Sequence, residues 1–142
     1  MERHISNTAE LIAFLQNHDG VAWVNHPSLA DHPCHDVAMR QMPKGAGSIV
    51  TMGIKGGRMA SQAFIEKVEL ASHLANVGDA KTLVIHPGST THSHISADAM
   101  KAAGLTDDLI RISVGLEDID DIKADFDRAI NFAIKKTSSK GA

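Results

Sequence analysis

One stretch decides the fold class: LIRISVGLEDIDDIKADFDRAINFAIKK, residues 109–136. Its first six residues are mostly apolar and β-branched, which predicts a strand over 109–114. The remainder predicts a long amphipathic helix, because its apolar residues recur at helical spacing. These apolar residues are Ile119, Ile122, Phe126, Ala129, Ile130 and Ala133. Acidic residues at 117–121 and the pair Lys135 and Lys136 suit the two ends of the helix dipole.

Strand patterns and helical patterns of apolar residues also alternate in the part of the chain before residue 109. This alternation predicts three further strands, at 21–24, 48–54 and 82–85, and four further helices: 7–17, about 33–42, one capped by Ser61 with Phe64, Val68, Ala71 and Leu74 on one face, and one from Ser96 to Gly104. Strands alternating with helices favour an α/β fold, and alternation alone favours a parallel sheet. The connections by themselves do not exclude a two-layer arrangement with helices on one side.

Composition narrows the class of protein. The chain has 142 residues, 43% hydrophobic and 22% charged, with a net charge of −3. This predicts one globular domain and argues against a nucleic-acid or anionic-membrane surface. No apolar run reaches the roughly 18–20 residues of a membrane span, and no secretory signal is predicted at the N-terminus. With a single cysteine, Cys34, we expect a soluble cytoplasmic protein.

Two groups of residues suggest a zinc site and a phosphate-binding loop, but a structural role explains each group better. His32, Cys34 and His35 are close in sequence but lack the paired spacing of a zinc site, so no metal ligand is predicted. The glycines fit neither a Walker nor a dinucleotide loop, and we expect them to serve turns. These glycines are at positions 45, 47, 53, 56 and 57.

Arg111 is the most informative single residue, because it interrupts an otherwise apolar strand. Alternation places Arg111 and Ser113 on the face opposite Ile110 and Ile112. From there Arg111 is able to hold a carboxylate in a cleft or to join a surface ion pair, and the residues alone favour neither. The hydroxyl-rich run 89–93 after the strand at 82–85 predicts helix capping at a pocket edge rather than covalent catalysis.

Three segments carry a resemblance to a known family: SHLANVGDAK at 72–81, IHPGSTTH at 85–92 and LIRISVGLE at 109–117. They resemble the Cys/Met-metabolism family of pyridoxal-phosphate enzymes, and in particular its O-acetylhomoserine sulfhydrylase branch. The run GIKGG at 53–57 also fits. The resemblance covers essentially the whole chain, but only the last third of the family's enzymes.

The resemblance implies a fold and a domain assignment. It implies residues 1–137 as a single small C-terminal domain, with 138–142 as a frayed tail. In this fold-type-I domain a mainly antiparallel sheet of about four strands carries its helices on one side. We therefore predict a two-layer α/β sandwich. The large N-terminal domain that binds pyridoxal phosphate is absent from the chain.

The resemblance also implies the site. Arg111 corresponds to the arginine that holds the substrate α-carboxylate, Thr82 stands where many relatives have a serine lining the substrate site, and Ser89 and Thr90 lie near the cleft entrance. None of the nine lysines sits in the family's Ser/Thr-Lys motif around the Schiff-base lysine. No catalytic or cofactor-binding residue is therefore predicted here, and we expect the isolated chain to be inactive.

The implied parent reaction converts O-acetylhomoserine and sulfide to homocysteine and acetate. Expected partners are the missing pyridoxal-phosphate domain, a small amino-acid substrate and, in the complete enzyme, further copies in a tetramer. Two alternatives stay open. The domain could come from a methionine γ-lyase or cystathionine synthase branch, or it could be a non-catalytic binding or assembly module, metal-loaded through its histidines.

Overall fold

The computed structural model describes residues 1–90, 99, 102 and 104–139. Its elements, in chain order, are α1 (Glu2–Gln16), β1 (Val21–Asn25), α2 (His35–Gln41), β2 (Ile49–Ile54), α3 (Gly57–Lys67), β3 (Ser72–His73), β4 (Leu83–Ile85), the 3₁₀ helix η1 (Pro87–Ser89), β5 (Leu109–Ser113) and α5 (Ile119–Ser138). All the predicted strands are present, with ends within one residue of those expected. Of the helix predicted from Ser96 to Gly104, only Ala99, Ala102 and Gly104 are among the described residues.

The strands of the described residues form one sheet in the order β1-β2-β5-β4-β3. Pairing is antiparallel between β1 and β2, β2 and β5, and β5 and β4, whereas β3 runs parallel to β4. The predicted mainly antiparallel sheet is confirmed, with five strands instead of about four. A parallel sheet, which alternation alone favoured, is wrong for most of the molecule.

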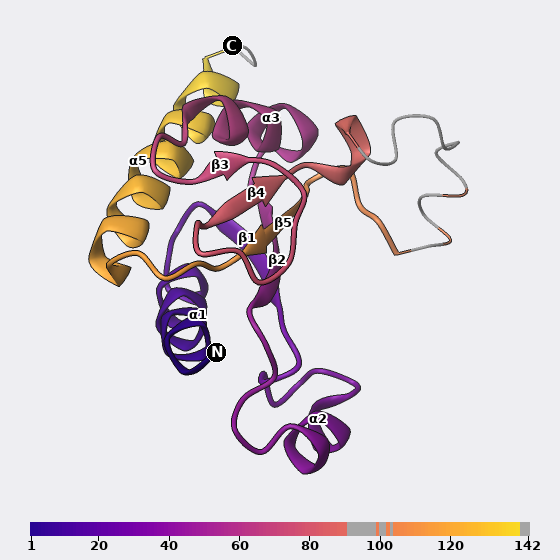
Figure 1. Ribbon diagram of the computed structural model, residues 1–142. Helices are drawn as coiled ribbons and strands as arrows, with labels where there is room; N and C mark the ends of the chain where they lie inside the picture. The colour runs from indigo at the N-terminus through magenta and orange to yellow at the C-terminus, as the bar shows by residue number, and fades with distance from the viewer. Residues whose placement is uncertain (91–98, 100–101, 103, 140–142) are drawn as a thin grey trace.

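Among the described residues, the helices α1, α3 and α5 cover one face of the sheet and leave the other open. The core joins α1, α3 and α5 to alternate strand residues such as Val50, Met52, Ile110 and Ile112, all fully buried. Figure 1 shows these three helices gathered to one side of the strands. Phe64 of α3 meets Phe126 of α5 edge to face, with ring centroids 5.2 Å apart. The two-layer prediction is therefore confirmed.

The prediction for α3 is wrong at both ends. The helix begins after Gly56, whose φ of 104° favours glycine, and Ser61 lies inside the helix instead of capping it. It ends at Lys67, so Ala71 and Leu74 are not on it. The cause lies in α5, where the Asp125 carboxylate accepts hydrogen bonds from the backbone amides of residues 69–71. Those amides cannot also close further turns of helix.

The long helix α5 follows its predicted stripe, with Ile122, Phe126 and Ala129 fully buried. Its N-cap is Asp118, whose carboxylate accepts from the amide of Asp120 at 2.9 Å. Ser138 belongs to the helix, so the tail does not begin there, and residues 140–142 lie outside the described part. None of the helices within the described residues is long and apolar enough to span a membrane.

Helix α1 starts at Glu2, five residues earlier than predicted. The reason is that its buried face carries polar side chains, including His4, Asn7 and Thr8, beside Leu11 and Leu15. A helix prediction that rests on the spacing of apolar residues misses buried positions that carry polar side chains.

Residues 26–47 form an arm that carries α2 and projects from the body of the molecule (Figure 1). At its base lies His26, which is 2% exposed. Its Nδ1 accepts from the amide of Ser28 at 3.2 Å, which places the proton of the neutral ring on Nε2. Burial lowers the pKa of His26 below its ordinary value of 6.5.

This burial predicts a pH dependence of stability. Below pH 6.5 the unfolded chain binds a proton at His26 more readily than the folded chain, so the free energy of unfolding falls as the pH decreases. The slope from one such group is at most about 1.4 kcal/mol per pH unit. Urea denaturation of the parent chain and of His26→Gln at pH 7.5, 6.5 and 5.5 measures it. We expect a shallower loss in the variant, and identical slopes would contradict the prediction.

Candidate functional site

The open face of the sheet carries a cavity of about 340 Å³ around Arg111. Strands β2, β4 and β5, the loop after β3, the first residue of η1 and the segment just before β5 all contribute to it. The described residues that line it are Thr51, Ala75, Ile85, Pro87, Leu105, Leu109 and Arg111. Arg111 is the one charged side chain among these residues, and the others except Thr51 are apolar. The cavity therefore offers one cationic group set in apolar walls.

The sheet register puts Arg111 at the centre of this face. Arg111 pairs across β5–β2 with Thr51 and across β5–β4 with Ile85. Directly paired residues of an antiparallel sheet project from the same face, whereas Ile110 and Ile112 project into the helix-covered core. Strand alternation predicted this placement of Arg111.

The guanidinium of Arg111 donates from Nη2 to the backbone carbonyl of Asn76 at 3.3 Å. Within the described residues, no carboxylate lies in ion-pair distance of Arg111. The surface ion pair that the sequence left open is thus not formed with any described residue. A half-buried guanidinium, with N–H donors that no described residue is seen to accept, is suited to hold an incoming carboxylate.

The segment 105–109 forms one wall of the cavity and is held in place by hydrogen bonds. The buried His86 donates from Nε2 to the carbonyl of Asp107 at 2.7 Å. The indole Nε1 of Trp23 donates to the Asp108 carboxylate at 2.9 Å, and the hydroxyl of Ser61 donates to the Asp108 carbonyl at 2.8 Å. A side chain at Gly53 would collide with this indole and carboxylate, which explains a glycine inside β2.

Gly53 is accordingly an exception among the glycines expected in turns. The other four, Gly45, Gly47, Gly56 and Gly57, have φ values between 65° and 129°. Those are conformations that turns require and that side chains disfavour, as predicted.

Thr82 lies apart from the residues that line the cavity. Its hydroxyl donates to Glu117 Oε2 at 2.8 Å and its amide to Glu117 Oε1 at 2.6 Å. The same hydroxyl accepts from the amide of Gly115, and the Thr82 carbonyl accepts from the amide of Ser72. Both backbone polar groups of Thr82 are therefore engaged within the fold, and the structure does not bring Thr82 together with Arg111.

Ser89 and Thr90 follow Pro87, which lines the cavity. Ser89 ends η1, and the Thr90 hydroxyl donates to the carbonyl of His86 at 2.9 Å. The remaining residues of the hydroxyl-rich run, 91–93, lie outside the described part of the chain.

Sequence reasoning missed the contribution of the loop between β3 and β4. Ala75 lines the cavity and Asn76 accepts the hydrogen bond from Arg111. The signal available was the polar turn Asn76-Val77-Gly78-Asp79 between two apolar stretches. Extending a helix through Leu74 concealed it.

The cavity does not fit pyridoxal phosphate by itself. Holding that group takes a lysine, a carboxylate facing the pyridine nitrogen and a cradle for the phosphate. Neither a lysine nor a carboxylate is among the described lining residues. A metal centre also finds no support in the described part of the chain, where no group of three His, Cys, Asp or Glu residues is arranged to hold an ion.

Comparison with known proteins identifies the family. The profile of the Cys/Met metabolism PLP-dependent enzymes matches residues 1–131. The chain belongs to this Cys/Met metabolism family. The resemblance carried by segments 72–81, 85–92 and 109–117 is thereby confirmed.

Family members with high similarity include sulfhydrylases and a lyase. O-acetyl-L-homoserine sulfhydrylase 1 of Thermus thermophilus is 46% identical over 129 residues, which cover 91% of this chain and 31% of that protein. Homocysteine synthase of Schizosaccharomyces pombe is 46% identical over 133 residues, or 94% of this chain and 31% of that protein. L-methionine gamma-lyase of Fusobacterium nucleatum is 39% identical, covering 92% of this chain and 33% of that protein. The chain thus spans about a third of the length of these curated relatives.

The fold agrees with a solved structure of the same family. Cystathionine gamma synthase of Xanthomonas oryzae, in complex with cystathionine, matches with a TM-score of 0.86 and 33% identity. The match covers 94% of this chain and 34% of that one. The family and the fold are therefore consistent with each other.

Proposed function

We propose that this chain is the substrate-binding C-terminal domain of an O-acetylhomoserine sulfhydrylase-type enzyme. The observation that carries the proposal is Arg111, a cation without a carboxylate partner among the described residues, in a largely apolar cavity of about 340 Å³. Identities of 46% to a sulfhydrylase and to a homocysteine synthase support this branch over others.

The role assigned to the chain is to bind and orient one end of the substrate. Arg111 holds the α-carboxylate of O-acetyl-L-homoserine, and the apolar walls keep water from that ion pair. Ser89 and Thr90 are proposed at the cavity entrance. Thr82 is proposed to act on the substrate only indirectly, through the position of the loop that it anchors.

In the proposed reaction the Cγ–O bond of O-acetyl-L-homoserine breaks, acetate leaves, and sulfide forms a Cγ–S bond to give homocysteine. Pyridoxal phosphate, the family's cofactor, supplies the electron sink for this chemistry. We assign it to the part of a longer enzyme that this chain does not include, and on that basis we expect the isolated chain to be inactive.

The same proposal includes partners of the chain, namely a pyridoxal-phosphate-binding domain and further copies of the complete enzyme, as a tetramer. Large apolar side chains stay exposed on the arm and on the loop after β3: Val37, Met39, Met42, Leu74 and Val77. Such side chains suit contacts with other parts of an assembly. Sedimentation of the complete enzyme measures the number of copies.

An assay of the complete enzyme tests the reaction. We expect O-acetyl-L-homoserine and sulfide to give homocysteine and acetate in equal amounts. Cysteine in place of sulfide tests for cystathionine formation, and L-methionine alone tests for thiol release. A higher kcat/KM in either of those assays would overturn the sulfhydrylase assignment in favour of the synthase or lyase branch. Lack of activity in all three, with stoichiometric zinc binding by the chain, would favour a non-catalytic module.

A further inference from the structure

The loop between β3 and β4 is tied to the body of the molecule at its neck. The amide of Ser72 donates to the carbonyl of Thr82 at 2.9 Å, and this bond closes the loop at its base. Glu117 holds Thr82 through two hydrogen bonds. The ends of the loop are thus fixed, while Leu74 and Val77 within it are more than half exposed.

Inside this loop, Asp79 organises the turn that reaches Arg111. One carboxylate oxygen, Oδ1, accepts from the amide of Lys81 at 3.1 Å, and the other, Oδ2, accepts from Nδ2 of Asn76 at 3.2 Å. These bonds from Lys81 and Asn76 lower the pKa of Asp79. The bond to Asn76 matters for the site, because the carbonyl of Asn76 is the acceptor for Arg111.

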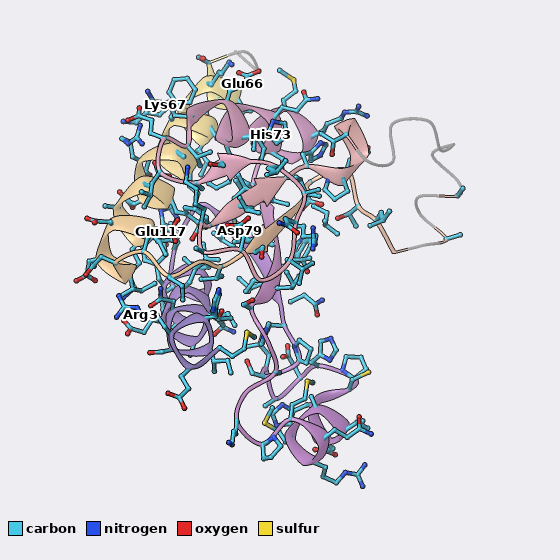
Figure 2. All side chains as sticks on the ribbon, viewed as in Figure 1. Arg3, Glu66, Lys67, His73, Asp79 and Glu117 are labelled. Carbon is cyan, nitrogen blue, oxygen red and sulfur yellow. The ribbon has the colours of Figure 1, made fainter. Side chains whose placement is uncertain are left out.

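Helix α1 holds the same turn from outside. The buried His4 donates from Nε2 to the carbonyl of Asp79 at 3.0 Å. Asn7, on the same side of α1, donates to the carbonyls of Gly115 and Glu117. Figure 2 shows Asp79 and Glu117 close to the part of α1 that carries Arg3. A continuous series of contacts therefore runs from α1 through Asp79 and Asn76 to the guanidinium.

We propose that Asp79 is a positioning residue for Arg111, acting through the carbonyl of Asn76. One edge of the guanidinium is held by that carbonyl, so its other N–H donors are kept in a fixed direction for a ligand carboxylate. Preorganisation of this kind reduces the conformational entropy that the arginine side chain loses when the ligand binds. That the ligand is an amino-acid carboxylate rests on the proposed function, whereas the restraint on Arg111 does not.

The substitution Asp79→Asn tests this step selectively. An amide at position 79 retains an oxygen for the Lys81 N–H but presents NH₂ to the Asn76 amide, so the link between the two side chains is lost. The double substitution Asn76→Asp/Asp79→Asn restores the link with donor and acceptor exchanged. The conservative substitution Asp31→Asn, on the exposed arm, is the control for loss of one negative charge.

The measurement is the ¹H–¹⁵N heteronuclear NOE of the Arg111 Nε–H in the 142-residue chain. The Arg111 signal is assigned as the one that is absent from the spectrum of Arg111→Lys. We expect a restrained side chain in the parent and in Asp31→Asn, loss of the restraint in Asp79→Asn, and recovery in the double variant. The dissociation constant for O-acetyl-L-homoserine, followed at the same signal, should rise about threefold to tenfold in Asp79→Asn and recover in the double variant.

The outcomes separate this inference from the proposed function. Equal restraint of Arg111 in the parent and Asp79→Asn would overturn the positioning role, as would a double variant without recovery. A backbone ¹H–¹⁵N spectrum that keeps its core signals shows that loss of restraint is not unfolding. If the parent chain restrains Arg111 but O-acetyl-L-homoserine does not shift its signal, the positioning role stands and the choice of ligand is refuted.

Discussion

Replacing Arg111 with alanine in the complete enzyme should raise the KM for O-acetyl-L-homoserine by about tenfold to 100-fold, with a smaller effect on kcat. The estimate follows from the roughly 1.5–3 kcal/mol that a hydrogen bond to a charged group contributes. Since the carboxylate does not change during the proposed reaction, the proposed contact with Arg111 would stabilise the bound substrate and the transition state to similar extents. Loss of such a contact appears mainly in KM.

Two comparisons make this result specific to the guanidinium. Arg111→Lys keeps the positive charge but loses the two-pronged geometry, and we expect it to recover only part of the lost affinity. Arg128→Ala removes an arginine that pairs with Glu69 and Asp125 on the helix layer, away from the open face, and should leave KM unchanged. Steady-state kinetics with varied O-acetyl-L-homoserine and saturating sulfide give the values. Unchanged kinetics in Arg111→Ala would exclude the carboxylate role.

The second large effect concerns stability. Asp125→Ala should lower the free energy of unfolding by about 3–5 kcal/mol, which corresponds to a decrease in Tm of about 10–17 °C for a chain of this size. Asp125 is 4% exposed, and its carboxylate accepts from the amides of Glu69, Leu70 and Ala71. Without it these donors lose their acceptor, and the segment that leads into β3 is released from α5.

Asp127→Ala is the matched control, because Asp127 lies on the same helix but pairs with His18 at the surface with its side chain 54% exposed. An exposed pair contributes about 1 kcal/mol or less. Asp125→Asn keeps one carbonyl oxygen and should fall between the two. Thermal unfolding followed by circular dichroism measures all three variants, and equal effects of Asp125→Ala and Asp127→Ala would show that the buried carboxylate does not anchor this segment.

Local sequence patterns predict a structural element correctly wherever the interactions that form the element lie between neighbouring residues. The stripe on α5 and the apolar runs of β2, β4 and β5 predicted their elements, since burial of one face imposes a regular period. Alternation within β5 also predicted the face on which Arg111 lies. These are properties of neighbouring residues along the chain.

Errors arose where distant residues compete for backbone hydrogen bonds. Apolar spacing predicts that helix α3 continues through Leu74, but the Asp125 carboxylate accepts the hydrogen bonds of the amides that follow Val68. The acidic run predicts Glu117 in the first turn of α5, whereas Glu117 lies before that helix and its carboxylate binds Thr82. Partners separated by 35 or more residues leave no periodic signal.

The amino-acid sequence alone determined the family, the order of the strands and helices other than β3 and η1, and the exposure of Arg111 on a face away from the core. Only the tertiary structure decided the strand order of the sheet, the apolar walls around Arg111 and the pairing of its guanidinium with Asn76 instead of any described carboxylate. The physical reason is that periodicity records which side of an element is buried. It does not record which remote groups satisfy a given donor, and in this molecule those remote bonds shape the cavity.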